Sequence, residues 1–159
     1  MIRIIIIILA IQMLTSCKNN DEPISTAFIA YGDLPYKDND YSLYESLIEN
    51  INASEPSLII HVGDAHNEDS CSNKNIDLMR NYMNDFDAPL LYTPGDNDWT
   101  DCAKYSDFDP VERLKYLRQT HYNSGATLGA RPLPVFDQNE SGYPENIRFM
   151  KDNIGFITL

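Results

Sequence analysis

Three aspartates that each follow a glycine are the residues of this sequence best suited to hold a cation. They are Asp33, Asp64 and Asp96, and they stand 31 and 32 residues apart. With only seven glycines in 159 residues, chance would produce fewer than one Gly-Asp pair. Carboxylate oxygens bind hard and borderline divalent cations, so the repeat predicts a metal site.

Each Gly-Asp pair follows, directly or after one proline, a short apolar run that is typical of a buried strand. The predicted strands are 26–31 (TAFIAY), 57–62 (SLIIHV) and 89–93 (PLLYT). Apolar residues at helical spacing predict helices over 41–51, 76–86 and 111–122. We expect a loop rich in Pro and Gly at 125–144 and the start of a fourth strand at 156–159.

Strands that alternate with helices predict an α/β fold with a parallel-type sheet. The strands are almost entirely apolar, as expected when both faces of a sheet are covered. Ligands of such sheets bind outside the carboxyl ends of the strands. The repeat should therefore bring Asp33, Asp64 and Asp96 to one edge, with a glycine before each to allow a tight turn.

Three carboxylates at one edge repel one another unless something compensates their charge. Between His61 and Asp109 the chain has eleven acidic residues, against only Lys74, Arg80 and Lys104. A bound divalent cation is the simplest compensation. The alternative is that the aspartates cap the helices and turns that follow them.

Composition limits the classes of function further. A chain of 159 residues is enough for one domain or part of one. It has 24 acidic and 12 basic residues and a net charge of −12, which excludes a typical nucleic-acid partner. Three cysteines are too few for a disulfide scaffold.

The N-terminus predicts export. After Arg3 comes an apolar run at 4–11, and Leu14-Thr15-Ser16-Cys17 resembles the lipobox of bacterial lipoproteins. The resemblance implies a signal peptide over 1–16, lipidation of Cys17, a polar tether over 17–25 and a folded domain over 26–159. The protein would then be anchored to the membrane through Cys17, in the bacterial cell envelope. The alternative is an ordinary signal peptide with a chance cysteine.

The order of the motifs GD, GD and GDND resembles the calcineurin-like metallophosphoesterase superfamily. The stretches YGDLPY, HVGDA and YTPGDNDWTDC look like a secreted bacterial branch of it. The resemblance covers 27–102 and extends to YPENIRF at 143–149. It implies that the chain forms the N-terminal part of a metallophosphoesterase-like sandwich.

The resemblance also implies a reaction and roles for the residues. A metal-dependent phosphoesterase of this kind hydrolyses a phosphorylated substrate with a hydroxide held between two metal ions. Asp33 would be a terminal ligand, Asp64 would bridge the metals, and Asp96 would replace an asparagine ligand. Asn97 would stand in place of the catalytic histidine, and Asp98, the trailing acid of the motif, is the second candidate catalytic residue. The resemblance does not decide which metal binds, and Mn, Fe, Zn, Mg and Ca all remain candidates.

The chain departs from the family pattern in three respects. Pro35 replaces the histidine of the first motif, although the nearby Tyr36 is a candidate phenolate ligand. Asn97 cannot serve as a general acid. No histidine follows His121, so we expect the domain to be incomplete at its C-terminus. His66, two residues after Asp64, is a further candidate ligand or substrate contact, or else an exposed loop histidine.

Two cysteines, Cys71 and Cys102, fall in loops that follow Gly-Asp pairs at the same sheet edge. If the protein is exported, they are expected to form a disulfide. The alternative is two free thiols. His61 lies within a predicted strand and His121 ends a predicted helix, so both are expected to be structural.

Three functions are compatible with these features. The first is a metal-dependent phosphoesterase with an Asp-rich site. The second is a non-catalytic exported lipoprotein that retains the fold. The third is an inactive truncated remnant.

Overall fold

The computed structural model describes residues 26–67 and 69–159. The predicted signal peptide, Cys17 and the tether lie outside the described residues. No helix among the described residues is long and apolar enough to cross a bilayer.

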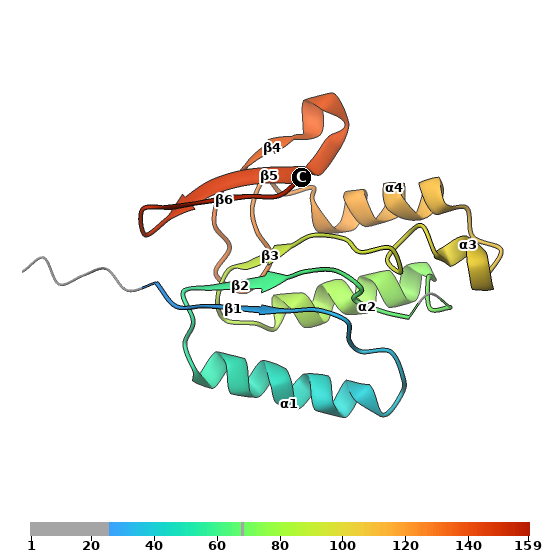
Figure 1. Cartoon of the computed structure of the whole chain (residues 1–159), viewed down its shortest axis with the longest axis horizontal. Helices are drawn as coiled ribbons and strands as arrows, with labels where there is room; N and C mark the ends of the chain where they lie inside the picture. The colour runs from blue at the N-terminus through green and yellow to red at the C-terminus, as the bar shows by residue number, and fades with distance from the viewer. Residues whose placement is uncertain (1–25, 68) are drawn as a thin grey trace, which may run out of the picture.

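The described chain folds into strands and helices that alternate at first and end in consecutive strands (Figure 1). The first part forms β1 (Phe28–Tyr31), α1 (Asp40–Ala53), β2 (Leu58–His61), α2 (Asn73–Asn84) and β3 (Leu90–Tyr92). Then follow α3 (Cys102–Tyr105), α4 (Pro110–His121), β4 (Phe136–Gln138), a 3-10 turn (Asn139–Ser141), β5 (Tyr143–Lys151) and β6 (Ile154–Ile157).

The first three strands form a parallel sheet in the order β1-β2-β3. Phe28 pairs with Leu58 and Ile59 pairs with Leu90, so the strands are in simple register. The mixed α/β class and the parallel pairing of the first three strands are therefore confirmed. The short α3 was not among the predicted helices.

The C-terminal strands do not extend this parallel sheet, although β6 overlaps the strand predicted at 156–159. β4, β5 and β6 form a separate antiparallel sheet in that order, and β4 lies within the segment expected to be a loop. The two-residue turn Asp152-Asn153, with φ of 49° and 65°, connects β5 to β6. A turn this short can join only antiparallel neighbours, because a parallel connection needs a long crossover.

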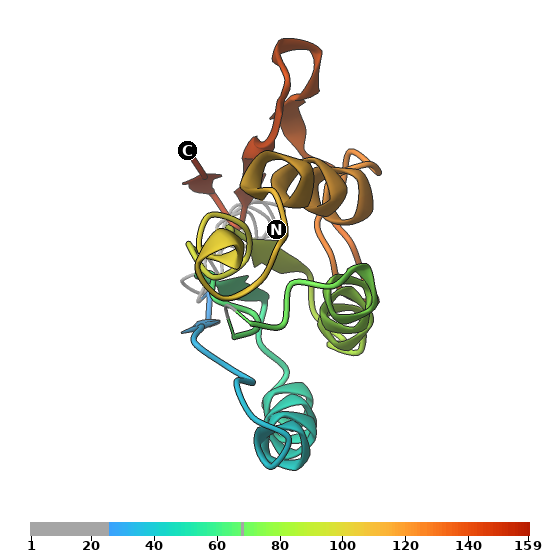
Figure 2. The ribbon, with the colours of Figure 1, turned by 90° about the vertical axis from the view of Figure 1, so that its right-hand side faces the viewer.

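Each face of the parallel sheet is covered by a different layer. Side chains of α1, α2 and α4, among them Tyr44, Met83 and Leu117, pack with Ile59 and Leu90. On the other face, Leu58 and Leu91 pack against two residues of the antiparallel sheet, which are Ile147 and Phe149. Figures 1 and 2 show α1 and α2 on one side of the parallel sheet and β4–β6 on the other. This double coverage explains why the first strands read as continuous apolar runs.

Two buried histidines line the helix side of the sheet near its carboxyl edge. His61 is fully buried, with its ring 4.6 Å from the Tyr31 ring and 5.4 Å from the Tyr92 ring. His121 is also buried, with its ring 5.2 Å from the ring of Tyr92. Burial lowers the pKa of His61 to about 3. Burial, together with the nearby Arg80 charge, lowers the pKa of His121 to about 3.

These histidines predict that the fold loses stability in mild acid. An unfolded histidine titrates near pH 6.5, so between pH 7 and pH 5 only the unfolded chain takes up the two protons. The free energy of unfolding should fall over this range by about 2 kcal/mol per histidine. Urea unfolding at several pH values measures this. His121→Gln should make the dependence shallower by about one proton, and an equally steep slope in that variant would contradict the assignment.

Candidate functional site

The loops that follow β1, β2 and β3 emerge at the same edge of the parallel sheet (Figure 1). Asp33 and Asp64 both adopt positive φ, 61° and 55°, a conformation that aspartate tolerates better than most residues. The Asp33 backbone N–H donates to the Gly63 carbonyl at 3.2 Å. The first two Gly-Asp pairs thus form similar turns that contact each other directly.

Two of the glycines are required by how closely these loops approach. A Cβ on Gly63 would lie 2.4 Å from the backbone nitrogen of Gly95. A Cβ on Gly95 would lie 2.1 Å from Oδ1 of Asp64. The second and third loops can therefore pack together only because neither glycine carries a side chain.

Asp98 joins the same two loops through its carboxylate. Its side chain is fully buried and accepts three backbone N–H groups, from Asp64 at 2.9 Å, Ala65 at 2.8 Å and Gly95 at 2.7 Å. Such charge-assisted bonds are stronger than neutral ones. We expected Asp98 beside the reacting group, but its burial and its three bonds suit a residue that positions the loops.

Four side chains converge around the Tyr36 hydroxyl, which we call the acidic cluster: Asp33, Tyr36, Asp64 and Asn97. The hydroxyl shares its single hydrogen between Asp33 Oδ1 at 3.2 Å and Asp64 Oδ2 at 3.3 Å. The side-chain amide of Asn97 donates to the same hydroxyl at 3.2 Å, and its backbone N–H donates to Asp64 Oδ1 at 3.2 Å. All three loops therefore contribute to one polar cluster.

The loop that carries Tyr36 is ordered by a carboxylate of the next helix. Asp40, the first residue of α1, accepts the backbone N–H groups of Tyr36 at 3.1 Å and Lys37 at 2.9 Å. These bonds hold Tyr36 over the sheet edge.

The charge of the acidic cluster is not balanced by a neighbouring cation among the described residues. Partial burial raises the pKa of Asp64, and the Asp98 and Asp96 charges raise it further, against the lowering effect of the Asn97 N–H. Burial raises the pKa of the Tyr36 phenol, and the neighbouring carboxylates of Asp64 and Asp33 raise it further. The ion pairs among the described residues involve Asp98, Asp101, Glu145 and Asp152, not Asp33, Asp64 or Asp96.

The other two candidates lie beside this cluster rather than in it. Asp96 is exposed, and it raises the pKa of Asp64 through its charge. His66 is buried with 2% of its surface exposed, and its Nε2 lies 4.0 Å from Asp98 Oδ1. His66 therefore lies behind the loops and is not exposed at the sheet edge.

Cys71 and Cys102 form a disulfide, with their Cα atoms 5.8 Å apart. It joins the loop after β2 to the start of α3, and both cysteines are fully buried. The backbone carbonyl of Cys71 accepts from the buried Arg113 guanidinium of α4 at 3.2 Å. The third site loop packs against this disulfide through the backbone carbonyl of Asn97.

The donor set of the cluster determines which metal it could hold. No group of three or more His, Cys, Asp or Glu side chains in the described part of the chain is arranged around one metal position. Asp33, Tyr36, Asp64 and Asn97 instead offer two carboxylates, a phenol and an amide. This all-oxygen set fits a hard cation that keeps several waters, since Mg²⁺ commonly uses one or two protein carboxylates.

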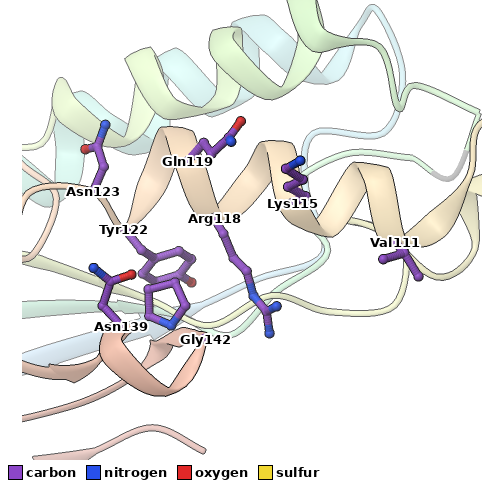
Figure 3. Close-up of a pocket in the computed structure, with 9 residues that line it drawn as sticks. Val111, Lys115, Arg118, Gln119, Tyr122, Asn123, Asn139 and Gly142 are labelled. Atoms are coloured by element: carbon purple, nitrogen blue, oxygen red, sulfur yellow. The ribbon is translucent and has the colours of Figure 1, made fainter.

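A cavity of about 500 Å³ lies elsewhere, between α4 and the segment that leads into β5 (Figure 3). Its lining includes Lys115, Arg118, Tyr122 and Asn139, and it contains none of the acidic cluster. Arg118 donates from Nε to Glu145 Oε2 at 2.8 Å, so its charge is already paired. The cavity and the acidic cluster are separate features.

Three residues of this region had no assigned role from sequence: Tyr92, Arg113 and Asp40. Tyr92 lies beside Asp98, whose charge raises the pKa of the buried phenol further. The spacing of Asp40 just before a helical pattern is a signal for a capping acid that could have identified it. Arg113 carries no such signal, because its partner is a carbonyl 42 residues away.

Comparison of the chain with known family models, with curated protein sequences and with solved structures finds no match.

The buried Asp98 carboxylate predicts a large effect of a nearly isosteric substitution. In Asp98→Asn the amide NH₂ would face backbone donors, and the charge-assisted bonds would be lost. The free energy of unfolding should fall by about 2–4 kcal/mol, measured by urea unfolding. The matched control is Asp96→Asn, which removes an exposed carboxylate and should change stability by about 0.5 kcal/mol or less. Equal effects of the two substitutions would refute the positioning role.

Proposed function

We propose that this protein is a divalent-cation-dependent phosphoric ester hydrolase whose site is the acidic cluster. The observation that carries the proposal is the convergence of Asp33, Tyr36, Asp64 and Asn97 at the carboxyl edge of a parallel sheet, where such sheets bind ligands. Clustered carboxylates without a paired cation favour a positively charged ligand. A phosphate ester can then approach this acidic edge only if a cation offsets the charge.

In this proposal Asp33 and Asp64 hold the cation, with Tyr36 and Asn97 as neutral oxygen donors beside them. The bound cation supplies Lewis-acid polarisation of a phosphoryl oxygen and offsets the charge that develops there. The donor set supports one hard cation directly. We also propose that the site binds a second metal ion. The proposal includes the metallophosphoesterase-like sandwich that the resemblance implies.

The side chains of the cluster also orient the substrate. The Tyr36 phenol stays protonated at neutral pH because burial and its carboxylate neighbours raise its pKa. In the proposal its hydroxyl hydrogen, shared by Asp33 and Asp64 in the structure, is released when those carboxylates bind the cation and is then donated to an anionic oxygen of the substrate. The Asn97 amide, fixed by its bond to Tyr36, can donate in the same way. Neither group transfers a proton readily, so neither acts as a general acid.

This lack of a general acid restricts the substrate class. A leaving oxygen that departs without receiving a proton must be stable as an anion. We therefore propose that aryl phosphates and other esters with acidic leaving groups are hydrolysed, and that simple alkyl phosphates react slowly. Asn97 is the residue that sets this preference.

We also propose that the protein is exported and anchored through Cys17. The Cys71–Cys102 disulfide supports export, because disulfides persist mainly in oxidising compartments.

Cation binding without hydrolysis is a second candidate function. The observation that favours it is the amide at Asn97, which cannot deliver a proton to a leaving group. Binding of Mn²⁺ with no turnover of an aryl phosphate would select this function over the first.

The function is tested by Asp64→Asn in the full chain. Asp64 accepts bonds from both Tyr36 and Asn97, so loss of its charge should weaken Mn²⁺ binding at least tenfold and abolish aryl phosphate hydrolysis. Calorimetric titration and a phosphatase assay measure these. Asp38→Asn, in the same loop as Tyr36 but exposed, is the control and should behave as wild type. If Asp64→Asn still binds the cation and still hydrolyses the aryl phosphate, the proposal is refuted.

Asn97→His should extend the substrate range. The backbone N–H that binds Asp64 is kept, and an imidazole is added that can protonate a leaving oxygen. General acid catalysis contributes about 10²–10⁴ in rate, so turnover of alkyl phosphates should rise while that of aryl phosphates changes little. A series of esters with leaving groups of different pKa measures the change in slope. An unchanged slope would mean that position 97 does not face the leaving group.

A further inference from the structure

The Cys71–Cys102 disulfide lies directly behind the acidic cluster. The Sγ atoms of Cys71 and Cys102 lie 3.8 Å and 3.6 Å from the backbone carbonyl oxygen of Asn97. Both cysteines are fully buried, so the sulfur atoms that contact this carbonyl are shielded from water.

Asn97 connects these sulfur atoms to the polar side of the site. Its backbone N–H donates to Asp64 Oδ1, and its side-chain amide donates to the Tyr36 hydroxyl, both at 3.2 Å. Its carbonyl therefore faces the disulfide, while its two nitrogens face the acidic cluster. A displacement of the disulfide would reach Asp64 and Tyr36 through this one residue.

The disulfide is itself held on the side away from the site. Arg113 of α4 donates to the Cys71 carbonyl at 3.2 Å and also bonds the Asn73 side chain. Its guanidinium lies 4.7 Å from the centre of the Phe108 ring, and the whole residue is 9% exposed. The bridge is thus fixed between α4 and the third site loop.

We infer that the Cys71–Cys102 disulfide is a positioning element of the acidic cluster, which sets the place of Asn97 and through it the geometry of Asp64 and Tyr36. A disulfide that acted only on overall stability would constrain the unfolded chain and leave the folded site unchanged. The positioning role predicts instead that the site loop opens locally, in the folded protein, when the bridge is removed. The part of the inference that concerns cation affinity rests on the proposed function, whereas the part that concerns Asn97 does not.

The test compares the full chain with Cys71→Ser/Cys102→Ser and with Met83→Ala. Met83 is a fully buried core residue of α2, so its truncation lowers stability without touching the bridge. Amide hydrogen exchange of Asn97, read by NMR under conditions where the fold stays intact, is the first readout. The affinity for Mn²⁺ is the second.

The expected result is at least tenfold faster exchange at Asn97 in the double serine variant than in Met83→Ala, together with at least tenfold weaker Mn²⁺ binding. Equal exchange at Asn97 in the two variants would overturn the inference. If the wild-type chain does not bind Mn²⁺ at all, the proposed function fails, and the exchange comparison still decides the positioning role.

A second variant covers the case in which the double serine chain does not fold. Arg113→Met keeps the bridge and most of the side-chain packing but removes the donor to the Cys71 carbonyl. It should speed exchange at Asn97 several-fold, because the bridge loses its hold on α4. Unchanged exchange at Asn97 in a folded Arg113→Met chain would overturn the inference.

Discussion

The site depends on one buried charge. The Asp98 carboxylate is removed from water and accepts hydrogen bonds from the backbone N–H groups of Asp64, Ala65 and Gly95, with Tyr92 and His66 beside it. A charge buried in this way is costly unless all its donors are in place. The loops after β2 and β3 must therefore adopt their positions together. The positive φ of Asp64 and the contact between Gly63 and Gly95 follow from this joint arrangement.

The acidic cluster lowers the stability of the fold. Asp64 lies among other carboxylates with a raised pKa, and no cation among the described residues pairs with it. Such arrangements are commonly found where function opposes stability. Hydrogen bonds from Tyr36 and Asn97 hold the Asp64 carboxylate in place despite this repulsion. The disulfide supports Asn97 from beneath. The cation site proposed for this cluster would require such a rigid support under a repulsive surface.

Local patterns predicted the part of the fold in which short-range and long-range forces agree. The apolar runs marked β1, β2 and β3, and the Gly-Asp repeat marked the loops that the structure brings together. The antiparallel sheet escaped prediction because β5 mixes polar residues such as Glu145 and Arg148 with its buried Ile147 and Phe149. Its strand character comes from pairing with β4 and β6 rather than from its own composition.

The same distinction applies to the site. Side chains that act near their own position in sequence, such as Tyr36 with Asp33, could be proposed from spacing. The burial of Asp98 could not, because it depends on the backbone N–H groups of Asp64 and Ala65, which lie 34 and 33 residues away, and on the neighbouring Tyr92. The burial of His66 could not either, because its ring lies beside the same Asp98. A sequence shows a carboxylate, but the three-dimensional neighbours decide whether it meets substrate or supports the loop that does.

The shared carboxylate also limits how this architecture can change. Because Gly95 and Asp98 of one loop are matched to Asp64 and Ala65 of another, neither loop can be exchanged alone for a loop of different length or sequence. A designer who wished to graft this site onto another parallel sheet would have to transplant the second and third loops as a single block. Chimaeras that recombine between the two loops would likewise place an unmatched loop opposite Asp98.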